Sequence, residues 1–163
     1  MKATELLEML REVYRDRLTL RNRVAAAAMH IGDYNINNTY QYVLNRADAH
    51  VRWLQDAIEE MGGTPEDLPI PDVKPTGKGR DAERSVIVGD RDGARAFVER
   101  WAPRIEAMPN ARHKAMLRVI LGEVREQERF FEQALAGRDD LLGRRADGAG
   151  TGDGVMATRW VGD

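Results

Sequence analysis

The sequence contains no cysteine, which excludes disulfides, zinc fingers, other thiolate metal sites and cysteine nucleophiles. It also has no excess of one charge, since 25 Lys and Arg stand against 27 Asp and Glu, for a net charge of -2. A protein that binds nucleic acid or an anionic membrane surface through electrostatics would carry a basic excess. We therefore expect neither nucleic acid nor a membrane as a partner.

Long hydrophobic runs are absent as well. The longest apolar stretch, residues 24–31, includes a histidine and is far too short to cross a bilayer. The first residues carry Glu5, Glu8 and Arg11 where a signal peptide would need an apolar core. These features predict a cytoplasmic protein, and a chain of 163 residues has the size of one domain.

Proline and glycine gather in two places. Four of the six prolines fall between Pro65 and Pro75, and seven of the 15 glycines fall in residues 137–163. Because both residue types interrupt regular structure, they divide the chain into two halves and a tail.

Each half has the periodicity of two helices, with apolar side chains three or four residues apart. The spacing predicts helices over residues 4–30, 37–61, 85–108 and 109–136. Glycines at 62 and 63 should end the second helix, because glycine tolerates the left-handed conformation there. Pro103 should kink or restart the third helix. The buried face of the third helix is predicted to consist of Asp90, Ala94, Phe97, Trp101, Ile105 and Met108.

The connections predict how these helices are arranged. Short turns make the helices of each half antiparallel neighbours, whereas the polar linker over residues 64–84 is too long for a turn. This pattern is typical of an all-α, antiparallel four-helix bundle with a long crossover between its second and third helices. We expect the bundle to occupy residues 1–136. Residues 137–163 form a glycine-rich tail, and its apolar end with Trp160 is expected to dock on a bundle.

The second and fourth helices contain similar segments, 77 residues apart. They read AHVRWLQDAIEEMGGTP and ILGEVREQERFFEQAL, and each sets two bulky apolar residues after a polar one. This duplication of a helix pair around a long connection resembles the ferritin-like superfamily, and most closely its rubrerythrin-type branch. The resemblance implies a bundle in which each half supplies one glutamate and one Glu-x-x-His pair to a centre of two iron or manganese ions.

The residues at those positions depart from the family pattern. The first Glu-x-x-His pair falls on Ala47 and His50, and the second falls on Val124 and Gln127. The two remaining glutamates fall near Tyr14 and Asp90, and Arg17 lies one turn beyond Tyr14, where it would repel a metal. A register shifted by one residue would recruit Glu123 and Glu126, but we expect these to point away from the apolar stripe.

The resemblance therefore implies a degenerate two-metal site. We expect a small, metal-free polar cluster of Tyr14, His50, Asp90 and Gln127 in the middle of the bundle. No cofactor is expected, and if a metal does bind, its ligands are His50 and Asp90. His30 lies at the C-terminal end of the first helix, where we expect it to cap the helix. His113 lies in the first turn of the fourth helix and is expected to be exposed.

Three functions remain open at this point. The first is a non-catalytic bundle that acts through interaction or small-ligand binding. The second is an enzyme, a non-haem iron or manganese oxidase or a peroxide-handling protein with an atypical metal site. The third is a cargo or docking protein that binds a protein partner through its Trp160 segment. A homodimer is expected, because Trp53, Phe130 and the methionine-bearing faces exceed what one bundle requires.

Overall fold

Four α-helices of similar length make up most of the chain. The computed structural model describes residues 1–138 and 140–142, and within them it contains no β-strand. The helices are α1 (Ala3–Ala28), α2 (Tyr34–Glu60), α3 (Arg80–Glu106) and α4 (Ala111–Leu135). The predicted all-α, four-helix fold is confirmed.

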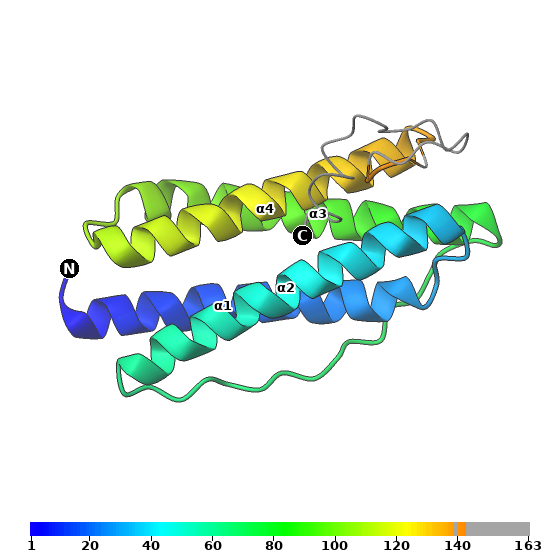
Figure 1. The fold of residues 1–163 in the computed structure, drawn as a ribbon. Coiled ribbons are helices and arrows are strands. Elements are labelled where there is room, and N and C mark those ends of the chain that lie inside the picture. Colours follow the sequence, from blue (N-terminus) through cyan, green and yellow to red (C-terminus); the bar gives the residue numbers. More distant parts are fainter. Residues whose placement is uncertain (139, 143–163) are drawn as a thin grey trace, which may run out of the picture.

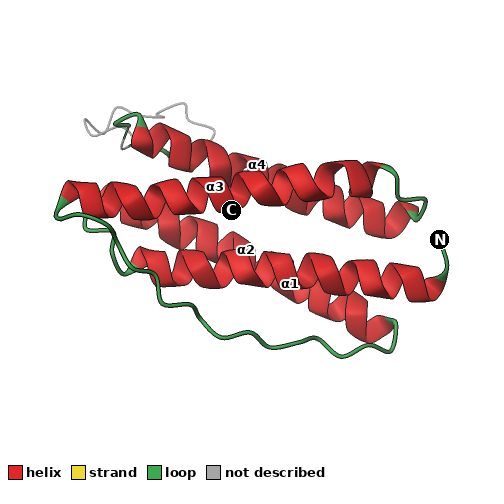
Figure 2. Cartoon of the chain, turned by 180° about the vertical axis from the view of Figure 1, so that it is seen from behind, coloured by secondary structure: helices red, strands yellow, loops and turns green. Residues whose placement is uncertain are grey.

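The helices pack as two antiparallel pairs (Figure 1). The first pair is α1 with α2 and the second is α3 with α4, and the pairs meet where α1 contacts α3 and α2 contacts α4. The connection 61–79 runs along the first pair from one end of the bundle to the other (Figure 2). Hydrogen bonds from Tyr14, Arg15 and Asn22 attach it to α1. Among them, the Tyr14 hydroxyl donates to the Glu66 carbonyl at 2.7 Å, and the Asn22 amide donates to the Leu68 carbonyl at 3.0 Å.

The ends of the helices follow local chemistry. α2 begins three residues before its predicted start, because the Asp33 carboxylate accepts the Ile36 N–H at 2.9 Å and caps the helix. α2 ends as predicted at glycine, with Gly62 at φ +80°. α3 begins at Arg80 instead of 85, and acidic residues in its first turn favour that start. Pro103 lies inside α3, but the helix continues to Glu106.

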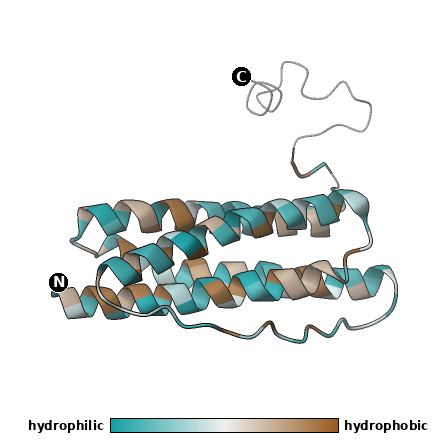
Figure 3. Ribbon diagram, turned by 60° about the horizontal axis from the view of Figure 1, so that its bottom comes forward, coloured by the Kyte–Doolittle hydropathy of each residue, from teal (hydrophilic) through white to brown (hydrophobic). Residues whose placement is uncertain are grey.

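Two apolar clusters form the core, one toward each end of the bundle. Figure 3 shows polar and apolar residues alternating along every helix, which is the pattern that buries one face. The first cluster, at the N-terminal end of α1, is the larger and includes Leu10, Leu54, Trp101, Ile105 and Leu117. The second includes Val24, Tyr40, Ile87, Phe131 and Leu141. All six residues of the predicted α3 face are buried.

Trp53 and Phe130, the two aromatic residues on which the homodimer prediction relied, both pack within a single chain. Phe130 is buried in the second cluster, and its ring meets that of Tyr42 edge-on at 6.0 Å. Trp53 is half-buried against the first cluster. The homodimer stays a prediction, and these two residues no longer argue for it.

The packed part of the chain extends beyond the predicted boundary at residue 136, because Leu141 is 7% exposed and contacts the second cluster. The predicted docking of Trp160 and its neighbours falls outside the described residues. None of the helices in the described part is long and apolar enough to cross a membrane.

Candidate functional site

Polar side chains are buried in the middle of the bundle, between the two apolar clusters. His50, Asp90 and Gln127 each lie on their helix between a residue of one cluster and a residue of the other. His50 is 0% exposed, Arg17 and Asp90 are 1% exposed, and Gln127 is 4% exposed. Because a buried polar group without a partner is costly, the hydrogen bonds of these residues decide what this layer can do.

Arg17 connects three helices. From α1, its Nε donates to Nδ1 of His50 on α2 at 3.2 Å, and its Nη2 lies 3.4 Å from Oε1 of Gln127 on α4. Its guanidinium therefore occupies the space between the imidazole and the amide. We call Arg17, Arg46, His50, Glu123 and Gln127 the arginine group.

These contacts set the tautomer of His50. An arginine N–H can only donate, so Nδ1 of His50 accepts and carries no proton. The proton is on Nε2, which donates to the Glu123 carboxylate. Glu123 is balanced by Arg46, whose Nη2 and Nε lie 2.6 and 2.9 Å from its Oε1. Both ring nitrogens of His50 are thus engaged.

Burial makes this imidazole hard to protonate. It lowers the pKa of His50 to about 4, and the positive charge of Arg17 adds to the effect, against the opposing contribution of Glu123. Burial also lowers the pKa of Arg17 to about 10, which leaves the guanidinium charged at neutral pH. With Arg17 and Arg46 cationic, Glu123 anionic and His50 neutral, the arginine group carries a net positive charge.

Asp90 belongs to a second, separate group with Tyr40 and Arg23. The Tyr40 hydroxyl donates to one carboxylate oxygen at 2.5 Å, and Arg23 Nε lies 3.1 Å from the other. Burial raises the pKa of Asp90 to about 6, against the opposing effects of Tyr40 and Arg23. Gly89 makes room for Arg23, because a Cβ at that position would lie 1.9 Å from Arg23 Nη2. We call these three polar residues the aspartate group.

The predicted four-residue cluster is thus divided among three environments. His50 and Gln127 come together through Arg17, and Asp90 lies in the aspartate group. The Tyr14 hydroxyl donates to the linker at Glu66 and accepts from the Gln55 amide at 3.2 Å. The expectation that Glu123 points away from the core is wrong, because its carboxylate reaches His50. The sequence contained a signal for this contact, because Glu123 lies next to the buried stripe of α4.

The side chains in this layer do not fit a two-metal centre. The lone pair of His50 Nδ1 accepts from Arg17, and a fixed guanidinium occupies the middle of the arginine group. Ala47 and Val124 offer no ligand atom at two of the family positions. In the described part of the chain, no group of three or more His, Asp or Glu side chains is arranged to hold a metal ion.

One donor of the arginine group is left for water. Nε2 of Gln127 has no hydrogen-bond partner within the described structure. Gln127 also lines a cavity of about 10 Å³, together with Tyr42, Arg46 and Glu126. A cavity of that size has room for about one water molecule. We expect an ordered water there.

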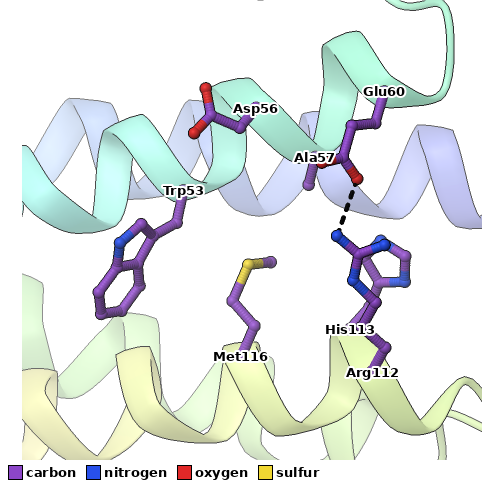
Figure 4. Close-up of a pocket in the computed structure, with 7 residues that line it drawn as sticks. All are labelled: Trp53, Asp56, Ala57, Glu60, Arg112, His113 and Met116. Carbon is purple, nitrogen blue, oxygen red and sulfur yellow. Dashed lines mark hydrogen bonds and ion pairs between the residues drawn. The ribbon is translucent and has the colours of Figure 1, made fainter.

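A larger pocket opens next to this layer, between α2 and α4 (Figure 4). It encloses about 220 Å³ and is lined by Trp53, Asp56, Ala57, Glu60, Arg112, His113 and Met116. Trp53 joins the pocket to the arginine group, because its ring lies 5.4 Å from that of His50. His113 is half-buried in this wall, so the expectation that it is exposed is wrong.

No family model, curated protein or solved structure matches this chain.

Proposed function

We propose that this chain is a ferritin-like bundle whose metal positions are taken by a hydrogen-bonded polar group, and that it acts without catalysis by binding a small ligand. The observation that carries this proposal is Arg17, a buried cation between His50 and Gln127. A metal ion in the same space would meet a fixed positive charge and an imidazole whose lone pair is already engaged. The long connection along α1 and α2 supports the ferritin-like arrangement.

The α2–α4 pocket supports the ligand-binding part of the proposal. Small-molecule sites are concave, largely apolar and equipped with a few polar groups. This pocket combines the indole of Trp53 and the thioether of Met116 with charged groups. It lies beside a layer that the arginine group holds in place, so its inner wall is supported.

Metal binding tests the first part. The protein is incubated with Fe(II) or Mn(II), washed with a chelator and analysed for bound metal. We expect no stoichiometric retention. NMR signals of the His50 ring should also stay sharp in Mn(II), because a paramagnetic ion broadens only nuclei close to it. Stoichiometric metal together with broadened His50 signals would overturn the proposal and favour the alternative, an iron or manganese oxidase or peroxide-handling protein.

Ligand binding is tested at Trp53. Its indole N–H gives one NMR signal, which Trp53→Phe assigns by its disappearance. A set of small aromatic compounds of positive, neutral and negative charge is titrated against the protein. We expect at least one of them to shift this signal in a saturable way. If none does, the ligand-binding role at this pocket is wrong.

A further inference from the structure

We propose that the α2–α4 pocket selects a small organic cation, an amine with an apolar or aromatic body, and this inference rests on the proposed ligand-binding function. Three features support this ligand class: an apolar wall, an unprotonated imidazole nitrogen, and at the rim a carboxylate that has no ion-pair partner among the described residues.

The apolar wall suits an aromatic or aliphatic body. Trp53 and Ala57 come from α2, and Met116 extends from α4 toward them (Figure 4). Trp53 also contacts His50, which Arg17 and Glu123 hold in one orientation. An indole supported in this way offers its π-face, and an ammonium group is attracted to such a face.

Of the carboxylates that line the pocket, one has no ion-pair partner in the described part of the chain. Arg112 Nη2 lies 3.0 Å from Glu60 Oε2, so these two compensate each other. Within residues 1–138 and 140–142, Asp56 has no cation within ion-pair distance. Asp56 is exposed on α2, and its carboxylate points away from α4 (Figure 4). One uncompensated anion therefore lies at the outer rim of the pocket, and its charge complements a ligand with a single positive charge.

His113 adds an acceptor. Asn110 Oδ1 accepts the backbone N–H of His113 at 3.2 Å, which identifies it as the oxygen, and it lies 2.8 Å from His113 Nδ1. Nδ1 therefore carries the proton and Nε2 has a free lone pair. Burial, followed by the charge of Arg112, lowers the pKa of His113, so the ring is neutral at pH 7. An N–H donor on the ligand can use this lone pair.

The same features disfavour other ligand classes. An anion would be repelled by the charge of Asp56 at the rim and would have to take Arg112 from Glu60. The volume of about 220 Å³ is below the range of drug-sized sites, so the ligand is small, of the size of one ring with a short amine chain.

The test uses three probes of matched shape on the full chain: phenethylammonium, 2-phenylethanol and phenylacetate. Each is titrated while the Trp53 indole N–H signal is followed by NMR. We expect phenethylammonium to bind most tightly, with the neutral probe weaker and the anion weakest. Asp56→Asn should weaken phenethylammonium binding about fivefold, as for an exposed ion pair. Glu59→Gln removes an equal charge from an exposed position of α2 that does not line the pocket, so it should leave binding unchanged.

Each failure has its own meaning. If the three probes bind equally, or if Asp56→Asn has no more effect than Glu59→Gln, the cation selectivity is wrong while ligand binding stands. If phenylacetate binds most tightly, the ligand class is reversed and Arg112 is the recognising group. If no probe shifts the Trp53 signal, the ligand-binding function itself fails.

Discussion

The α1–α3 interface and the α2–α4 interface each enclose a hollow, yet only one is a credible binding site. The α1–α3 hollow is the slightly larger, about 250 Å³ against 220 Å³. Its charged residues satisfy one another: Arg100 Nη1 lies 2.8 Å from Asp16, which also accepts the Trp101 indole N–H at 2.9 Å. At the α2–α4 hollow, Asp56 has no ion-pair partner among residues 1–138 and 140–142. Volume alone therefore does not mark a site, because a ligand needs groups that the protein has not already paired.

The tryptophans differ in the same way. Trp101, on the α1–α3 side, is 0% exposed, and Arg104 and Arg100 lie over its ring at 4.4 and 4.9 Å from the centroid. Trp53, on the α2–α4 side, is half-buried and lines a pocket. The first tryptophan is committed to packing, whereas the second keeps surface available for a ligand.

Replacing each tryptophan by alanine should give the largest difference between the two interfaces. Trp101→Ala removes a fully buried ring and a hydrogen bond, and should reduce the free energy of unfolding by about 3–5 kcal/mol. Trp53→Ala should cost clearly less while abolishing probe binding in the pocket. Urea denaturation of both variants measures the difference. Equal losses would show that Trp53 is as structural as Trp101.

Removing Arg17 should have the next largest effect. Arg17→Met leaves His50 Nδ1 and the Gln127 carbonyl without their donor, and should cost about 2–4 kcal/mol, in the range for a disrupted buried polar network. Arg125→Met is the matched control, since Arg125 is exposed on α4. Urea denaturation of both variants should show a loss only for Arg17→Met. A variant as stable as the parent would mean that methionine packs as well as the arginine, and that the arginine group adds no stability.

The arginine group and the aspartate group should also respond to acid with opposite signs. For His50 the folded pKa is about 4, below the usual 6.5, so the unfolded chain binds more protons between these values and acidification destabilises the fold. For Asp90 the folded pKa is about 6, above the usual 3.8, so the folded chain binds more protons and rising pH destabilises it. Each group contributes at most about 1.4 kcal/mol per pH unit.

The parent protein should therefore change little in stability between pH 4 and pH 6. Asp90→Asn should leave the His50 effect, with stability falling as the pH drops below 6.5. His50→Gln should leave the Asp90 effect, with stability falling as the pH rises from 4 to 6. Thermal unfolding across this range gives the slopes directly. Slopes of equal sign in both variants would contradict the assignment of the two groups.

Two glycine substitutions should have the smallest effects on stability. Gly122→Ala, on the surface of α4 with no atom near the new methyl group, should stabilise the protein by about 0.5–1 kcal/mol through helix propensity. Gly89→Ala has the same gain in helix propensity, but the new methyl group displaces Arg23 from Asp90. The net change in the free energy of unfolding should therefore be near zero. Thermal unfolding distinguishes them, and an equal gain in both would show that the Arg23–Asp90 pair contributes nothing.

The arrangement of polar residues was the part least accessible from sequence. Helical periodicity identifies which face is buried, and for α3 it correctly placed Asp90 beside Phe97 and Trp101. It cannot tell which polar residues of different helices meet, because that depends on how far each helix is rotated and shifted against its neighbours. The expected cluster of Tyr14, His50, Asp90 and Gln127 was therefore divided among three environments.

Long side chains add to this uncertainty. Arg17, Arg23 and Glu123 reach partners beyond the face on which their Cα atoms lie, since several rotatable bonds separate the charge from the backbone. Likewise, α3 starts five residues before the predicted 85, because the first turn of a helix depends more on capping and charge than on apolar spacing.

The sequence by itself determined the four helices, the apolar stripes that bury one face of each, and the glycine that ends α2, because these depend on spacings within a single segment. Contacts between helices decided that Arg17 occupies the space between His50 and Gln127, that Asp90 pairs with Tyr40 and Arg23, and that Asp56 has no ion-pair partner in the described part of the chain. These outcomes depend on contacts between segments 33 or more residues apart, and the packing of whole helices sets those contacts.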